Sequence, residues 1–220
     1  MKNMKAVIFD MDGVLLDTET ICEKTWDIAA REMNLSDIQE TFLKCLGTTK
    51  KETTRIIHEK YGNHVDVDAL MQRSHDLFEE VEKTQGIDLM PYAKETLVYL
   101  KEKGYRIALA SSTRGPTVRR QLGNLGILQY FETLSTGDMV KNSKPDPEIF
   151  ALAAKSLGLE PAECYAVEDS FNGIKSSFGA GLVPIMVPDK IQPTEEIKSM
   201  CYKVFPSLKE FVDFLESSNS

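Results

Sequence analysis

Short runs of apolar residues alternate along this chain with longer stretches in which apolar residues recur every three or four positions. The short runs, several of which end abruptly in polar residues, predict four buried strands: residues 5–10 (KAVIFD), 105–110 (YRIALA), 165–168 (YAVE) and 183–187 (VPIMV). Helical spacing is clear in residues 26–33 and 208–215. Strands that alternate with helices predict an α/β protein with a parallel sheet and helices on both of its faces.

The segment from residue 18 to residue 86 departs from this alternation. It has no strand pattern, only helical periodicity, and it contains all three histidines and the single tryptophan. We therefore predict a small all-helical cap domain at residues 18–86, inserted after the first strand. Residues 1–17 and 87–220 would then form a Rossmann-like core, whose size is typical of one domain.

Composition narrows the classes of protein that fit this pattern. The formal net charge of −8 argues against nucleic-acid binding, which requires a clustered basic face. The chain has no apolar run long enough for a membrane span, and its first residues lack the apolar centre of a signal peptide. Its four cysteines are widely spaced, which is typical of reduced thiols and not of a zinc site or a disulfide framework. We expect a cytoplasmic protein, with a monomer as the default.

Polar residues gather where the predicted strands end, and in a parallel sheet these ends share the edge at which ligands bind. Asp10 ends the first predicted strand, and Asp12 and Gly13 follow closely. Two neighbouring carboxylates at the end of an apolar strand are costly without compensation, which a divalent cation such as Mg²⁺ supplies. An aspartate in this position can also attack phosphorus. The alternative is an ordinary acidic turn that contains a glycine.

Two further groups of polar residues occur later in the chain. Ser111, Ser112 and Thr113 follow the second predicted strand and offer hydroxyls and backbone amides that can cradle a phosphate. The alternative is that they cap the next helix in the ordinary way. Lys144 stands before a proline and a predicted helix. Its ammonium can reach a phosphoryl group or a nucleophilic carboxylate, and the alternative is a solvated loop lysine.

Glu168 and Asp169 close the strand at residues 165–168 and repeat the pattern of a metal site. Asp169 or Ser170 can also cap the helix that follows, and capping does not exclude metal binding. Together the four clusters supply a nucleophile, a proton donor, phosphate-binding groups and metal ligands. In-line phosphoryl transfer requires this set, because it depends above all on positioning and on charge neutralisation.

The order and spacing of these clusters resemble the haloacid dehalogenase superfamily over essentially the whole chain. The resemblance rests on residues 10–19 (DMDGVLLDTE), Ser111, Lys144-Pro145 and residues 168–170 (EDS). Within the superfamily the chain is most similar to the β-phosphoglucomutase-like phosphatases, whose helical cap follows the first motif. The resemblance implies a Mg²⁺-dependent phosphatase that hydrolyses a small phosphorylated metabolite, such as a sugar phosphate, through an aspartyl-phosphate intermediate.

The same resemblance implies a role for each matching residue. Asp10 would be the nucleophile and Asp12 the general acid and base. Ser111 and Lys144 would hold the phosphoryl group. The residues implied for the Mg²⁺ site are Asp10 and Asp169 through their side chains, Asp12 through its backbone carbonyl, and Glu168 in support of these ligands.

A β-phosphoglucomutase-type sugar-phosphate mutase is the alternative function. In that mutase a cap histidine shortly after the first motif helps to protect the aspartyl-phosphate from hydrolysis, and by spacing this position falls on Cys22. A neutral thiol cannot replace imidazole in proton transfer, so the sequence favours hydrolysis. Lys50 and Arg73 are candidate substrate-binding residues of the cap, and the alternative is that both are ordinary solvated charges.

Other classes of protein agree less well with the sequence. Asp12 argues against haloalkanoate dehalogenases, which need neither Mg²⁺ nor a second acid, and against phosphonate hydrolases, which have a small residue there. Residues 137–144 lack the second glycine of a nucleotide-binding P-loop. A binding module without catalysis would retain all of these residues without using them.

Overall fold

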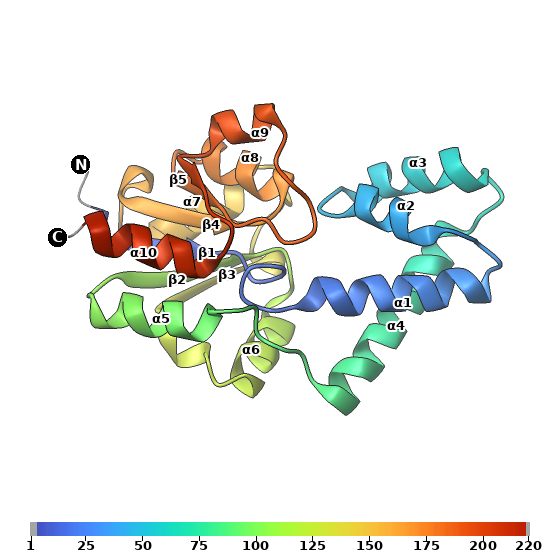
Figure 1. Cartoon of the computed structure of the whole chain (residues 1–220), viewed down its shortest axis with the longest axis horizontal. Coiled ribbons are helices and arrows are strands. Elements are labelled where there is room, and N and C mark those ends of the chain that lie inside the picture. Colours follow the sequence, from blue (N-terminus) through green and yellow to red (C-terminus); the bar gives the residue numbers. More distant parts are fainter. Residues whose placement is uncertain (1–3, 219–220) are drawn as a thin grey trace. The chain divides into compact units, whose positions relative to one another are not determined.

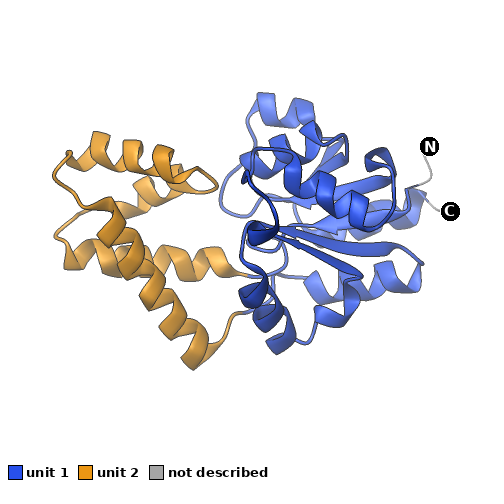
Figure 2. Ribbon diagram, turned by 180° about the vertical axis from the view of Figure 1, so that it is seen from behind, with its two compact units in different colours: residues 1–16, 88–220 blue, residues 17–87 orange. Residues whose placement is uncertain are grey.

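The computed structural model describes residues 4–218 (Figure 1). The chain divides into two compact units, which Figure 2 distinguishes by colour: Met1–Leu16 with Asp88–Ser220, and Asp17–Ile87. Their limits lie one residue from the core and cap boundaries that the sequence suggests. The ends of the predicted core, residues 1–3 and 219–220, lie outside the described residues.

A parallel sheet forms the centre of the larger unit (Figure 1). Its described strands are β1 Ala6–Phe9, β2 Arg106–Ser111, β3 Thr133–Thr136, β4 Cys164–Glu168, β5 Val183–Met186 and β6 Lys203–Val204. They lie in the order β3-β2-β1-β4-β5-β6. The chain therefore builds the sheet outward from β1 in one direction and then in the other, so β1 and β4 lie at the point where the strand order reverses. Open parallel sheets bind ligands at this point.

The central strand β1 is buried along its whole length, as expected for a parallel strand that is covered on both faces. Phe9 at its end is level with Leu109 of β2 and with Val167 of β4. Asp10 continues this register, because its N–H donates to the carbonyl of Val167 at 2.9 Å. The residues that follow β1 and β4 consequently emerge side by side.

Helices cover both faces of the sheet. The helices of this unit are α5 Ala93–Glu102, α6 Gly115–Asn124, α7 Glu148–Ser156, α8 Phe171–Gly179, α9 Glu195–Met200 and α10 Leu208–Ser218, with short 3-10 turns η1 Leu128–Tyr130, η2 Gly137–Met139 and η3 Pro161–Glu163. In β4, Ala166 packs against α7, while the ring of the adjacent Tyr165 lies 5.8 Å from that of Phe211 in α10. Successive strand residues point to opposite faces, so α7 and α10 lie on opposite sides. The predicted α/β architecture is confirmed.

The smaller unit contains only helices among its regular elements. They are α1 Thr18–Glu32, α2 Ile38–Cys45, α3 Lys50–Tyr61 and α4 Val67–Gln85. Its apolar core includes Ala29, Ile57 and Leu70. A buried hydrogen bond of 2.9 Å between the hydroxyls of Thr25 and Ser74 joins α1 to α4. None of the helices within residues 4–218 combines the length and the apolar composition that a membrane span needs.

Candidate active site

The segment after β1 is a tight turn that its own backbone hydrogen bonds hold in place. The carbonyl of Met11 accepts the N–H groups of Leu15 and Leu16 at 2.9 and 3.0 Å. Gly13 has φ +73°, and a Cβ atom at this position would lie 2.4 Å from Oδ2 of Asp169. Glycine is therefore required twice, for the left-handed backbone and for the close approach of Asp169. The glycine of the D-x-D-G motif thus allows the carboxylate of Asp169, which follows β4, to lie against the turn.

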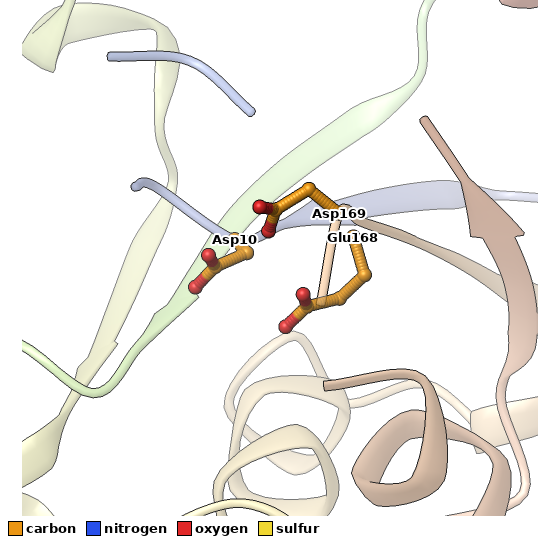
Figure 3. A group of neighbouring side chains, drawn as sticks. All are labelled: Asp10, Glu168 and Asp169. Atoms are coloured by element: carbon orange, nitrogen blue, oxygen red, sulfur yellow. The ribbon is translucent and has the colours of Figure 1, made fainter. Parts of the chain in front are cut away.

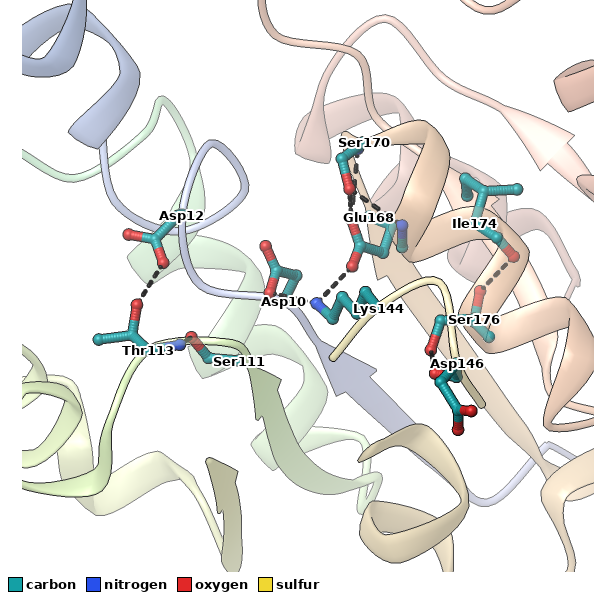
Figure 4. Close-up of polar contacts among 12 residues, drawn as sticks. Asp10, Asp12, Ser111, Thr113, Lys144, Asp146, Glu168, Ser170, Ile174 and Ser176 are labelled. Atoms are coloured by element: carbon teal, nitrogen blue, oxygen red, sulfur yellow. Dashed lines mark hydrogen bonds and ion pairs between the residues drawn. The ribbon is translucent and has the colours of Figure 1, made fainter. Parts of the chain in front are cut away.

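Lys144 connects the ends of β1 and β4 through two short ion pairs (Figure 4). Its Nζ atom lies 2.6 Å from Oδ1 of Asp10 and 2.6 Å from Oε1 of Glu168. The side chains of Lys144 and Asp10 are only 8% and 10% exposed, and that of Glu168 is fully buried. Water therefore screens these charges little, and each ion pair is stronger than a surface pair would be.

Burial and charge act in opposite directions on this group. Burial alone would lower the pKa of Lys144, but the carboxylates of Asp10 and Glu168 outweigh it, and the pKa is raised. Burial raises the pKa of Glu168, and the nearby charge of Lys144 opposes the rise. The ammonium of Lys144 therefore stays charged at neutral pH and donates to Oδ1 of Asp10.

Ser170, at the start of α8, also contacts Glu168. The Oε2 atom of Glu168 accepts hydrogen bonds from the backbone N–H of Ser170 at 3.3 Å and from its hydroxyl at 3.0 Å. The hydroxyl of Ser170 also accepts the N–H of Gly173 at 3.1 Å and so caps α8. Of the two candidate caps that the sequence offers, Ser170 takes this role.

The sequence reasoning missed Gly173. A Cβ atom there would lie 1.9 Å from the Oε1 and Cδ atoms of Glu168, so no larger residue fits beside the buried carboxylate. A glycine in the first turn of a helix is itself a signal of close approach, because glycine destabilises a helix relative to alanine.

We expect Gly173→Ala to lower the free energy of unfolding by about 1–3 kcal/mol, because the new methyl group must displace Glu168 from Lys144. Gly123→Ala is the matched control. Gly123 lies in α6, and an added Cβ atom meets nothing within 4 Å there, so this change should leave stability unchanged or raise it slightly. Equal urea midpoints for the two variants would contradict the packing role of Gly173.

Three carboxylates meet at the ends of β1 and β4 (Figure 3). Asp10, Glu168 and Asp169 each offer an oxygen atom, and these atoms lie within 4.8 Å of one another. Among the described residues, Lys144 contacts two of these acids, Asp10 and Glu168, and the three side chains place several oxygen donors around one point. Carboxylate oxygens in such an arrangement fit a hard divalent cation. Glu168 already accepts from Lys144 and Ser170, which is consistent with the supporting role that the sequence suggests for it.

The end of β2 adds hydroxyl groups on the other side of Asp10 (Figure 4). Ser111 is buried, and its Oγ atom accepts the N–H of Thr113 at 3.1 Å. The hydroxyl of Thr113 donates to Oδ2 of Asp12 at 3.0 Å. Ser112 is exposed. The structure thus brings together residues that the sequence singles out at the ends of three strands. They are Asp10 and Asp12 after β1, Ser111 and Thr113 at the end of β2, and Glu168 and Asp169 at the end of β4.

Lys50 and Arg73 lie in the helical unit, and both are exposed. Nζ of Lys50 lies 2.8 Å from Oδ1 of Asp68, and Arg73 forms a two-pronged contact with Glu32 at 2.6 and 2.8 Å. Each cation is therefore matched by an acid of its own unit. A substrate contact for either residue stays a prediction, and it would require the ion pair to open.

The comparisons with known proteins agree with this site. Residues 7–187 match the family model of the haloacid dehalogenase-like hydrolases. A phosphorylated carbohydrates phosphatase of Thermotoga maritima is 32% identical over 183 residues, which cover 81% of this chain and 82% of that protein. A beta-phosphoglucomutase of Bacillus subtilis is 31% identical over 191 residues, which cover 84% and 83%.

A solved structure extends the match to the fold. A HAD family hydrolase from Deinococcus radiodurans R1, with bound phosphate and sodium, superposes with a TM-score of 0.82 at 23% identity and covers 100% of this chain and 98% of its own. At this identity the similarity establishes the fold. The chain belongs to the haloacid dehalogenase-like hydrolases, and the prediction of an enzyme of this family is confirmed.

Proposed function

We propose that this enzyme is a Mg²⁺-dependent phosphatase that hydrolyses a small phosphorylated carbohydrate through an aspartyl-phosphate on Asp10. The observation that supports the proposal most is the buried contact of Lys144 with Asp10. A lysine that fixes one oxygen of a carboxylate orients the whole group for attack. Within the described residues, Lys144 contacts the Asp10 carboxylate through Oδ1, so Oδ2 can serve as the attacking atom.

In the first step an oxygen of Asp10 attacks phosphorus, and the bond from phosphorus to the leaving oxygen breaks. Asp12 gives a proton to that oxygen, so the carbohydrate leaves as an alcohol. Lys144 has three N–H donors and uses two of them for Asp10 and Glu168. The third can meet an oxygen of the transferring phosphoryl group, and the hydroxyl of Ser111 can donate to another.

In the second step water attacks the phosphorus of the aspartyl-phosphate. Asp12, now a carboxylate, takes a proton from that water, and the bond between phosphorus and Asp10 breaks. Inorganic phosphate leaves and the Asp10 carboxylate is restored. The residues that would hold Mg²⁺ are Asp10 and Asp169, with the carbonyl of Asp12 and with Glu168 in support. When bound, the cation neutralises the negative charge that phosphate adds to this acidic site.

The substrate class rests on the relatives. These relatives include a phosphorylated carbohydrates phosphatase and a beta-phosphoglucomutase, and both names concern sugars that carry phosphate. Between the two activities, Cys22 favours the phosphatase, because a thiol does not perform the proton chemistry of a histidine. A screen of sugar and polyol phosphates that measures both phosphate release and isomerisation distinguishes these functions. Isomerisation faster than phosphate release would overturn the phosphatase proposal.

We expect a chelator to abolish phosphate release from p-nitrophenyl phosphate and added Mg²⁺ to restore it, because the acidic cluster repels the phosphate when no cation is bound. Initial rates at increasing Mg²⁺ concentration measure the effect. Full activity in excess chelator would contradict the metal requirement.

Thermal unfolding tests metal binding independently of turnover. Mg²⁺ at about ten times its Kd should stabilise the wild-type protein by about 1.4 kcal/mol, and it should stabilise Asp169→Asn much less because a charged ligand is lost. An equal shift in both proteins would exclude Asp169 as a ligand.

A further inference from the structure

The side chain of Asp12 is tied to a different strand end from its own. Its Oδ2 atom accepts the hydroxyl of Thr113 at 3.0 Å, across a separation of 101 residues (Figure 4). Asp12 belongs to the turn after β1, and Thr113 belongs to the loop that leads from β2 into α6. Both residues are partly buried. This hydrogen bond therefore fixes the carboxyl group relative to the sheet and not only to its own turn.

The backbone of Thr113 is hydrogen-bonded to Gly137, which directly follows β3. Its carbonyl accepts the N–H of Gly137 at 3.0 Å, and its own N–H donates to Oγ of Ser111. Gly137 approaches the loop so closely that a Cβ atom there would lie 2.0 Å from the carbonyl oxygen of Ser112. The next residue strengthens this contact, because Oδ1 of Asp138 accepts the N–H of Gly115 at 2.8 Å.

These contacts fix the backbone of Thr113 independently of Asp12. Thr113 is fixed through its backbone at both its N–H and its carbonyl, while the contact with Asp12 uses only its side chain. The Thr113 hydroxyl is therefore a fixed donor that helps to orient the carboxyl group of Asp12.

We propose that Thr113 is a positioning residue, anchored by Gly137, that orients the side chain of Asp12 for its role as general acid toward the leaving oxygen. The inference rests on the proposed function, and it differs from the substrate-binding role that the sequence suggests for Thr113. Because the effect passes through Asp12, it concerns the departure of the leaving group and not the affinity for phosphate.

The test compares two substrates that differ in how much they need a proton. Phenolate is a poorer leaving group than p-nitrophenolate, so phenyl phosphate depends more strongly on general acid catalysis. The parameter kcat/KM reports the steps up to phosphoryl transfer to Asp10. Thr113→Val removes the hydroxyl at nearly constant volume, and Thr113→Ser retains it. Thr117→Val makes the same chemical change in the first turns of α6.

In Thr113→Val, kcat/KM for phenyl phosphate should fall about 10-fold or more, and that for p-nitrophenyl phosphate less than about 3-fold, with KM nearly unchanged. Thr113→Ser and Thr117→Val should resemble the wild type. Thr113→Ala, which removes the hydroxyl without adding a methyl group in its place, must show the same selectivity.

Two results would overturn the inference. Equal losses for both substrates with a raised KM would assign Thr113 to phosphate binding, and unchanged kinetics would show that its hydroxyl has no role. Failure of the proposed function looks different, because then the wild-type protein releases no Mg²⁺-dependent phosphate from either substrate. An active wild type with unselective Thr113 variants therefore rejects the inference alone.

Discussion

Asp10→Asn is expected to lower the rate of phosphate release by on the order of 10⁴-fold or more, because an amide is a poor nucleophile and cannot form the aspartyl-phosphate. The change is nearly isosteric, and Lys144 keeps Glu168 as its partner, so the protein should fold. Turnover of p-nitrophenyl phosphate with Mg²⁺ measures the loss, and urea unfolding confirms the fold. Residual activity within about tenfold of the wild type would remove Asp10 from its role as nucleophile.

Asp17→Asn provides the matched control for this variant. Asp17 lies seven positions further along the same motif and caps α1 by accepting the N–H of Thr20 at 3.2 Å. Asparagine caps a helix as well as aspartate does, so turnover should stay close to that of the wild type. Water enriched in heavy oxygen tests the second step, because attack on phosphorus labels the phosphate. Label in Asp10 would instead indicate attack on its carboxyl carbon.

The strands that the sequence predicts are those that lie inside the sheet. β1, β2, β4 and β5 are runs of apolar residues because each has neighbours on both sides. β3 was missed, since three of the four residues in its sequence TLST carry hydroxyl groups, which is more typical of a loop. It lies at one edge of the sheet, where its two hydroxyl residues at the carboxyl end are nevertheless buried. β6 at the opposite edge has two exposed residues, too few for any periodic signal.

The site shows the same division between local and long-range information. Asp10, Lys144 and Glu168 could be predicted, because each stands in a short motif: Asp10 and Glu168 at the end of a strand, and Lys144 in the loop before α7. The positions of their neighbours could not, because these depend on packing between distant segments. One example is the close approach of Gly173 to Glu168. Another is the hydrogen bond from Thr113 to Asp12, which joins the loops after β2 and β1. Gly137 directly follows β3, which was missed, so its close approach to Ser112 in the loop between β2 and α6 had no signal in the sequence.

Lys144→Met is expected to abolish turnover and to lower the free energy of unfolding by about 3–5 kcal/mol, as removal of one partner from a buried ion pair does. It leaves Asp10 and Glu168 close together without the ammonium that both contact at 2.6 Å. Urea unfolding without divalent cations measures the effect. Lys198→Met makes the same change in an exposed ion pair with Glu195 and should alter stability little. Equal stability of the two variants would show that the buried pairs contribute nothing.

A second substitution separates lost charge balance from lost packing. Adding Glu168→Gln to Lys144→Met removes the buried charge, so it should recover much of the stability but none of the turnover. The pH dependence follows from the same carboxyl group. Burial raises the pKa of Glu168, and without Lys144 that pKa rises further. Such a group is protonated in the folded protein below its raised pKa, so the stability lost in Lys144→Met should be smaller at about pH 5 than at about pH 8. A loss that is the same at both values would place the cost in packing and not in the uncompensated charge of Glu168.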